Sequence, residues 1–423
     1  NFTNEETVTF QQANGENYNF ISSFDETRLR RFNTLFGSDF VPNRYGIVNN
    51  YDLEERIYAG FVMLKIKVGQ KFTVIPGFRM ERSDNVYRAA YSDLVGDFGE
   101  DGFIRDTSAT VDYTIPMPHL HLKYEPVEWL DFRASYSTTL ARPDYEYIVP
   151  ATAVSRGGDI EVKQGNPGLE ASVSRNYDVF ITAYSNKWGL FSGGVFYKDI
   201  ADAFYPQVIG LNTDSIAALY GFAPRDVTGG ILTTYQNSPE SYVRGFEVEL
   251  QSNLNFLPGF LKGFVLNVNY TRLTSETTIN AFRRELIIQP PIVRRLVIPF
   301  QRKAALIGQA RDIFNISLGY DYKRSLSMRA SASYQGDKLA SYSDQVNKDR
   351  FNRGFWRFDA ALKYKFQNGL HLFLNLNNLT DQKDINYFTS LDRALNEAEF
   401  VTSVNRFGAT ATFGVQYKLD ANR

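Results

Sequence analysis

The chain has 423 residues, and its 46 basic and 47 acidic side chains leave a formal net charge of −1. A charge this close to zero provides no bulk field to attract nucleic acid. The absence of Cys excludes disulfide frameworks and thiolate metal sites, and no apolar stretch approaches the roughly 20 residues of a membrane-spanning helix. Aromatic residues make up 15% of the chain, which is high for a soluble enzyme and suits a β-barrel wall with aromatic girdles at both lipid interfaces.

Residues 5–23 predict a first, weakly patterned strand, and a polar and aromatic loop over 24–52 follows it. Six hairpins come next, and both arms of each alternate apolar and polar residues. Because successive strand side chains point to opposite faces, each arm has one apolar and one polar face. The paired arms are 55–68 with 71–82, 109–125 with 128–141, 171–185 with 189–205, 242–251 with 264–271, 312–323 with 326–334, and 353–366 with 370–379. A last strand is predicted over 407–419.

The hairpin over 353–379 shows the pattern most clearly. One face of its first arm carries Trp356, Phe358, Ala360, Leu362, Tyr364 and Phe366. The other face carries Arg357, Asp359, Ala361, Lys363 and Lys365. A half-buried sheet in a soluble protein also alternates, so the repetition of this pattern along the chain, and not one hairpin, indicates the fold class.

Short turns and long loops alternate along the whole chain. The turns lie at 69–70, 126–127, 186–188, 255–262, 323–325 and 367–369, and long loops fill the gaps between the hairpins. In the loop before 242, residues 214–220 predict a short helix. About 14 strands with this rhythm are typical of outer-membrane barrels, which place short turns in the periplasm and long loops outside. We therefore predict an all-β fold, an antiparallel transmembrane β-barrel of the bacterial outer membrane, with both termini on the periplasmic side.

Nine short stretches, in this order, resemble the barrel of TonB-dependent outer-membrane receptors, particularly those of the Bacteroidetes type. They are ERIYAG (55–60), PGFRME (76–81), RASYSTTLARP (133–143), GNPGL (165–169), SRNYD (174–178), GVFYKDI (194–200), RGFEVE (244–249), NVNYT (267–271) and LNNLTD (376–381). Each alone is a weak signal, but the ordered set is specific and spans most of the chain.

The resemblance implies a barrel of about 22 strands that an N-terminal plug closes from inside. The whole chain, 1–423, is then expected to be one domain, the C-terminal part of such a barrel, because no plug-like segment and no energy-coupling motif is seen near Asn1. A smaller complete barrel, also with an even number of strands, is the alternative.

The resemblance also implies a receptor that binds a scarce solute at its extracellular loops and imports it with energy from the TonB–ExbB–ExbD system, relayed through the plug. Outer-membrane lipid, including lipopolysaccharide, is an expected partner, and the resemblance allows for a surface lipoprotein partner; nucleic acid is not expected. The alternatives are a passive porin of about 14 strands and an outer-membrane barrel hydrolase, although the chain is not expected to be an enzyme.

Aromatic and Arg side chains in the outer loops are the candidate substrate contacts. Such residues can stack on an organic ligand and form bidentate hydrogen bonds to its carboxylate or phosphate groups. The candidates are Tyr145, Tyr147, Arg156, Tyr205, Tyr220, Arg225 and Tyr235. Any one of them could instead be an ordinary polar loop residue.

Other charged and polar groups are weighed as structural. Lumen-side charges such as Arg79, Glu81, Arg133, Arg357 and Asp359 are expected to form mostly cross-strand pairs. The basic residues in the loop 274–309 could bind lipopolysaccharide phosphates or an anionic substrate, or simply be solvated. His119 and His121 share a face but lack a third ligand nearby, so no metal site and no cofactor is predicted.

Overall fold

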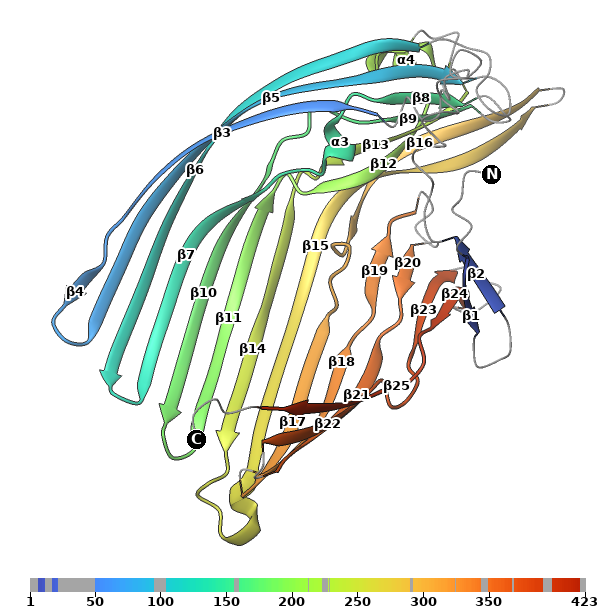
Figure 1. Ribbon diagram of the computed structural model, residues 1–423. Helices are drawn as coiled ribbons and strands as arrows, with labels where there is room; N and C mark the ends of the chain where they lie inside the picture. The colour runs from blue at the N-terminus through green and yellow to red at the C-terminus, as the bar shows by residue number, and fades with distance from the viewer. Residues whose placement is uncertain are drawn as a thin grey trace.

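The computed structural model describes most of the chain (Figure 1). The described residues are 7–11, 17–21, 50–94, 104–155, 160–211, 213–222, 227, 229–289, 292–323, 325–343, 349–366, 369–390 and 398–418. The predicted all-β antiparallel architecture is confirmed. Among the described residues, no helix combines the length and the apolar composition needed to cross a membrane.

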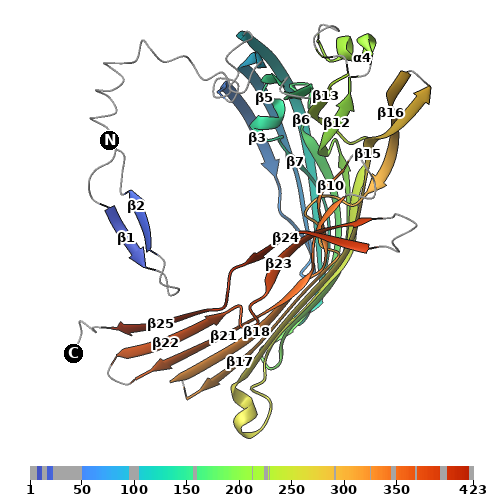
Figure 2. The same ribbon diagram turned by 90° about the vertical axis from the view of Figure 1, so that its right-hand side faces the viewer.

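One large antiparallel sheet, called the wall below, forms the body of the molecule. In pairing order its strands are β3 (Asp52–Met63) with its continuation β4 (Ile66–Val68), β5 (Phe72–Leu94), β6 (Ile104–Val127), β7 (Leu130–Ala141), β10 (Ser172–Ser185), β11 (Gly189–Ala201), β14 (Ser241–Asn253), β15 (Phe264–Gln289), β17 (Asp312–Tyr322), β18 (Leu326–Gln335), β21 (Phe355–Lys365), β22 (Leu370–Asn377) and β25 (Thr410–Tyr417). All six predicted hairpins and the predicted last strand are present in it. Figure 2 shows the wall as a deeply curved sheet that does not close on itself.

The predicted first strand over 5–23 is wrong. Its residues form β1 (Thr7–Gln11) and β2 (Asn17–Ile21), which pair with each other in a separate two-stranded sheet. The sequence contains a signal for this break, because Asn14-Gly15 is a dipeptide that favours tight hairpin turns.

The predicted long loops contain more strand than expected. β5 and β15 continue well past the bilayer, and β15 pairs with β16 (Ile292–Ala304) across most of the loop predicted over 274–309. Both arms of this extension alternate imperfectly, so the period-two signal does not separate them from loop. The predicted short helix is confirmed as α4 (Asp214–Leu219), where Thr213 accepts a hydrogen bond from the Ile216 amide at 3.3 Å, as an N-cap residue does.

Two smaller groups of elements lie at the loop end of the wall (Figure 1). The first, called the loop head, contains α3 (Tyr145–Ile148), β8 (Thr152–Ser155), β9 (Glu161–Gln164), β12 (Phe204–Gly210), α4 and β13 (Ile231–Asn237). β8 runs parallel to the outer end of β5, and β9 runs parallel to β13. The second group is a four-stranded sheet of β19 (Lys338–Ser341), β20 (Arg350–Asn352), β23 (Lys383–Ser390) and β24 (Ala398–Arg406). The turn end carries only short connections, the longest of which includes the 3-10 helix η2 (Gly259–Gly263).

Candidate functional site

The outward face of the wall is apolar and bounded by aromatic side chains at two levels. At the loop end, rings of neighbouring strands follow one another at centroid distances of 5.0–6.4 Å. This outer girdle contains Tyr136, Tyr177, Tyr197, Phe246, Tyr270, Phe314, Tyr334 and Trp356. At the turn end, a second girdle includes Phe72, Tyr124, Phe132, Phe264, Tyr320, Tyr364 and Phe366.

The distance between the girdles matches a bilayer. On β21 the two levels are marked by Trp356 and Phe366, ten residues apart in the sequence. At about 3.3 Å per residue and a strand tilt of roughly 40°, this is about 25 Å along the membrane normal. The side chains between the girdles are apolar and exposed, for example Val179, Val195 and Leu362. In a soluble protein such a band would be covered, so it is the lipid-facing surface of a membrane wall.

The inward face is polar. Between β14 and β21, side chains that share the inward parity line a hollow of about 240 Å³. They include Glu249, Gln251, Asn267, Asn269, Asn315, Ser317, Ser331, Ser333, Arg357 and Asp359. A face of this composition is solvated or in contact with other polar protein surface, as the lumen of an outer-membrane barrel is.

The predicted lumenal ion pairs form, but many lie along one strand and not across two. Arg79 binds Glu81 at 2.5 Å, Arg133 binds Asp131 at 3.0 Å, and the Arg357 guanidinium lies 3.7 Å from Asp359. Residues i and i+2 share a face, and an Arg side chain is long enough to span that spacing.

One of these networks is centred on a buried carboxylate and connects the wall to the loop head. Glu81 is 7% exposed and accepts hydrogen bonds from Arg79 on its own strand and from Arg142 at the end of β7. Arg142 also lies 3.4 Å from Glu55 and donates to the Ser83 hydroxyl at 3.2 Å. Because Arg142 immediately precedes the segment that leads to α3, this network fixes the base of the loop head.

The structure places the predicted loop tyrosines inside the loop head and at its border. Tyr147 and Tyr235 stack with ring centroids 3.8 Å apart and pack on a buried cluster of Tyr87, Ile148 and Leu169. Tyr145, in contrast, is 44% exposed.

The other predicted contacts are spread out. Tyr205 is 3% exposed, its hydroxyl oxygen accepts a hydrogen bond from the Asn280 amide at 3.0 Å, and its ring meets Tyr342 edge-on. Tyr220 packs against a second apolar cluster around α4. Arg156 and Arg225 lie outside the described residues. Of the five candidates that the structure describes, it stacks Tyr147 and Tyr235 directly on each other.

The stacked pair should make the loop head sensitive to alkali. Burial raises the pKa of Tyr235 to about 12 from its usual value of 10.0, with the Tyr147 phenol as a second cause, and burial also raises the pKa of Tyr147. The fold favours the neutral phenols, so their contribution to stability is complete below pH about 10 and is lost as the pH rises towards 12. A tyrosinate titration at 295 nm should show a late-ionising component, to which the buried Tyr87 and Tyr342 also contribute, and Tyr235→Phe should lower its amplitude by one tyrosine. Ionisation of both phenols near pH 10 would contradict the stacked arrangement.

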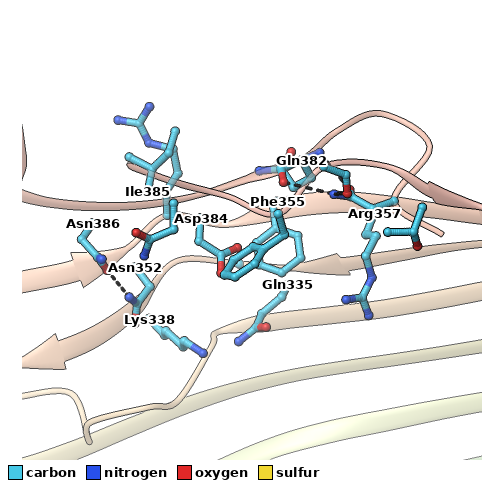
Figure 3. Close-up of a pocket in the computed structure, with 16 residues that line it drawn as sticks. Gln335, Lys338, Asn352, Phe355, Arg357, Gln382, Asp384, Ile385 and Asn386 are labelled. Carbon is cyan, nitrogen blue, oxygen red and sulfur yellow. Dashed lines mark hydrogen bonds between the residues drawn. The ribbon is translucent and has the colours of Figure 1, made fainter. Parts of the chain in front are cut away.

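A polar cavity of about 530 Å³ lies at the loop end of β18 and β21, beside the four-stranded sheet (Figure 3). Its lining combines amide side chains with three cations, one carboxylate and two aromatic rings. These are Gln335, Asn352, Asn378, Gln382, Asn386 and Asn405, then Lys338, Arg353 and Arg357, Asp384, and Phe355 and Phe407. Because Phe355 and Arg357 have the inward parity of β21 and follow directly on the outer girdle, this pocket lies at the mouth of the lumen. We refer to it as the mouth pocket.

The lining of the mouth pocket is partly occupied by its own contacts. Arg353 pairs with Glu399 and lies 5.3 Å from the ring centroid of Tyr387, and Asn352 bonds to Asn386. Asp384 and Lys338, which also line the mouth pocket, form no ion pair among the described residues. Amides can donate and accept at once, so this surface suits a polar organic ligand with several hydrogen-bonding groups.

Asn378, in the LNNLTD stretch (376–381), holds together the strand ends at the edge of the mouth pocket. Its φ of +53° lies in the left-handed region, which Asn tolerates better than most residues, and Asp381 has a φ of +51°. The Asn378 side chain accepts from the Gln382 amide at 2.8 Å and donates to the Gly408 carbonyl at 3.0 Å. The motif thus joins β22, β23 and β25. Its amide density is the signal that could have revealed the mouth pocket from the sequence.

Two of the basic residues that could form an anion site already make ion pairs with carboxylates of this chain. Arg302 is about 10% exposed and forms a bidentate pair with Asp349 at 2.8 and 2.6 Å, and Lys303 pairs with Glu276 at 2.5 Å. The side chains of the other Arg residues of this cluster lie outside the described ones. His119 and His121 lie on the lumenal face with ring centroids 5.6 Å apart, and among the described residues no group of three or more potential ligands could hold a metal ion.

Comparisons with known proteins agree with this geometry. The family described as "TonB dependent receptor-like, beta-barrel" matches residues 1–379. A search of curated protein sequences gives no significant match. Similar solved structures are a mutant ferric enterobactin receptor of Pseudomonas aeruginosa in complex with enterobactin (TM-score 0.52, 13% identity, 86% of this chain and 54% of that one) and the siderophore receptor PiuA of Acinetobacter baumannii (0.55, 13%, 87% and 44%). The copper transporter OprC is a third (0.55, 13%, 86% and 48%). At these identities the likeness shows the fold, and the chain spans about half the length of these structures.

Proposed function

Since this chain belongs to the TonB-dependent receptor-like β-barrel family of the outer membrane, we propose that it captures a scarce polar solute at its extracellular end and takes part in importing it into the periplasm. We further propose that the protein is a receptor of the Bacteroidetes type and that this chain forms the C-terminal part of a larger barrel. Energy would come from the TonB–ExbB–ExbD system and reach the barrel through a plug domain.

The mouth pocket is the observation that carries this proposal. It faces the lumen at the extracellular level of the wall, where an arriving solute would first meet the barrel interior. Asp384 and Arg357 provide opposite charges, and Phe355 provides an apolar ring. Each surrounding amide can donate and accept hydrogen bonds, so together they can bind a ligand that carries both donors and acceptors. The loop tyrosines Tyr145, Tyr147 and Tyr235 would border the entry from the opposite side of the loop end.

Growth under limitation tests the transport proposal. A strain that lacks the gene should grow more slowly than the wild type when one scarce solute, such as a ferric siderophore, copper or a glycan, limits growth. Loss of TonB or collapse of the proton-motive force should abolish the advantage of the wild type. An advantage that persists without energy would instead support the passive porin, as would steady open-channel conductance of the purified full-length protein in planar bilayers.

Variants of the mouth pocket test the site. With the solute so identified, Arg357→Gln and Asp384→Asn should each raise the half-saturating concentration for uptake about tenfold, the effect of about 1.4 kcal/mol of lost binding. Lys365→Gln is the matched control, because Lys365 lies on the same strand and face as Arg357 but eight residues nearer the turn end. Equal uptake by all three variants would remove the mouth pocket from the proposal and leave the family assignment intact.

A further inference from the structure

A belt of charged side chains runs across part of the outward face of the wall, just beyond the outer girdle. Seven strands carry an aromatic or apolar outward side chain at the level of the outer girdle and, two residues nearer the loop end, a charged outward side chain. The seven are Arg56 beyond Tyr58, Arg82 beyond Met80, Arg175 beyond Tyr177, Asp199 beyond Tyr197, Arg244 beyond Phe246, Arg272 beyond Tyr270 and Asp312 beyond Phe314. We call this set the outer belt. Five of its seven members are Arg, and it lies at the depth of the lipid headgroups.

Most cations of the outer belt already have a carboxylate partner. Arg175 pairs with Asp199 at 3.0 Å, and Arg82 lies 2.8 Å from Asp84 and 3.6 Å from Asp112. Arg56 pairs with Glu54. These Arg side chains are about half exposed or more, so each pair is weak, but its charges are matched locally.

Arg244 differs from the others. It is exposed and forms no ion pair among the described residues; its guanidinium carbon lies 5.6 Å from the ring centroid of Tyr242. Both carboxylates diagonal to it in the sheet are engaged elsewhere, Asp199 by Arg175 and Glu276 by Lys303. A positive charge is therefore left over at this point of the outward face.

A second guanidinium lies beside Arg244. The register pairs Phe246 with Arg272, so Arg244 and Arg272 are diagonal neighbours, which lie about 7–8 Å apart in a sheet. Arg272 is 44% exposed and lies 3.4 Å from Asp312, a longer separation than between Arg175 and Asp199 (3.0 Å) or between Arg82 and Asp84 (2.8 Å). Two guanidinium groups at this spacing can hold one phosphate between them, because each presents parallel N–H donors to phosphate oxygens.

We infer that Arg244 and Arg272 form a binding site for a phosphate group of lipopolysaccharide in the outer leaflet. The site points into the membrane interface and not into the lumen, so a soluble solute on the transport path would not meet it. Phe246 and Tyr270 lie directly beneath the two Arg residues, where they can contact the acyl chains of the same lipid. The inference does not depend on the proposed transport function.

The test uses the full-length protein, purified in detergent and stripped of lipid. Its affinity for diphosphorylated lipid A should exceed its affinity for dephosphorylated lipid A at least about tenfold, as expected when charge-assisted hydrogen bonds are lost. Arg244→Gln with Arg272→Gln should remove that preference, and Arg244→Gln alone should reduce it severalfold. Arg82→Gln is the matched control, an outward belt Arg of similar exposure that two carboxylates already neutralise, and it should keep the preference.

Three results would overturn the inference. They are equal binding of the two lipids by the wild type, a preference that the double and single variants retain, and full competition by inorganic phosphate at the concentration of the lipid. The last would mean that the site holds a free anion and does not select a lipid. If the double variant fails to fold, Arg244→Gln alone decides the outcome, since this side chain makes no ion pair whose loss could destabilise the barrel.

Discussion

Leu362→Arg is expected to destabilise the barrel by about 2–4 kcal/mol, because it places a cation in the middle of the lipid-facing band. Leu362 is 39% exposed and lies on β21 between the two girdles, with the outward parity of Trp356 and Tyr364. The free energy of unfolding, measured by urea titration of tryptophan fluorescence in lipid vesicles, should report this loss.

Ala361→Arg is the matched control, since Ala361 precedes Leu362 and points to the opposite face. It lines a polar hollow together with Asp359, Asn375 and Thr412, and its cross-strand neighbour is Arg329, which Asp321 already pairs at 2.8 Å. A new guanidinium would meet water and a carboxylate there, and the cost of facing a second, neutralised cation is small. The change in its free energy of unfolding should stay below about 1 kcal/mol. Equal destabilisation by the two variants, or a larger effect of Ala361→Arg, would contradict the assignment of the outward face to lipid.

Glu81→Ala is expected to cost about 1–3 kcal/mol of stability, because it removes the buried carboxylate to which both Arg79 and Arg142 donate. Glu81 is 7% exposed and lies between Arg79 and Arg142. Since Arg142 fixes the base of the loop head, the segment after it should also become more susceptible to limited proteolysis.

Two further variants separate this mechanism from a general effect of losing a lumenal carboxylate. Glu247→Ala removes an inward-facing Glu that has no ion pair among the described residues, and it should change stability by less than about 1 kcal/mol. Adding Arg79→Leu and Arg142→Leu to Glu81→Ala should recover part of the lost stability, because no guanidinium is then left without the Glu81 carboxylate; the recovery is incomplete because Glu55 loses its contact with Arg142. A Glu81→Ala effect as small as that of Glu247→Ala would show that the network is solvated and not buried.

The sequence correctly predicted those features that a single strand encodes by itself. The alternation over 356–366 assigned each side chain to lipid or lumen, and the register confirms those faces. It failed over 5–23, where a weak pattern concealed a turn, and over 274–309, where β15 and β16 extend beyond the bilayer without clean alternation. Outside the membrane neither face meets hydrocarbon, so the physical reason for strict alternation is gone.

The candidate site was harder to predict because its parts are distant in sequence. Tyr147 and Tyr235 were selected as separate loop residues, and only the folding of the loop head stacks them on each other. The mouth pocket draws on residues from Gln335 to Thr410. The sequence predicts Arg357 as one of many lumenal charges and places others in strands or motifs, but it selects none of them as a ligand contact. Nothing in the local sequence indicates which loops will meet above the wall.

By itself, the sequence determined that this protein is a membrane wall of antiparallel strands, with an apolar and a polar side and a rhythm of short turns and long loops. These properties follow from the period of a strand and from the different solvents on its two faces, so each strand records them locally. The tertiary structure alone decided which carboxylates Arg142 contacts, which tyrosines stack, and that Arg244, beside Arg272, forms no ion pair within the described part of the chain. Each of these depends on the register between strands and on the path of the outer loops, which are set by the whole sheet and by no single segment.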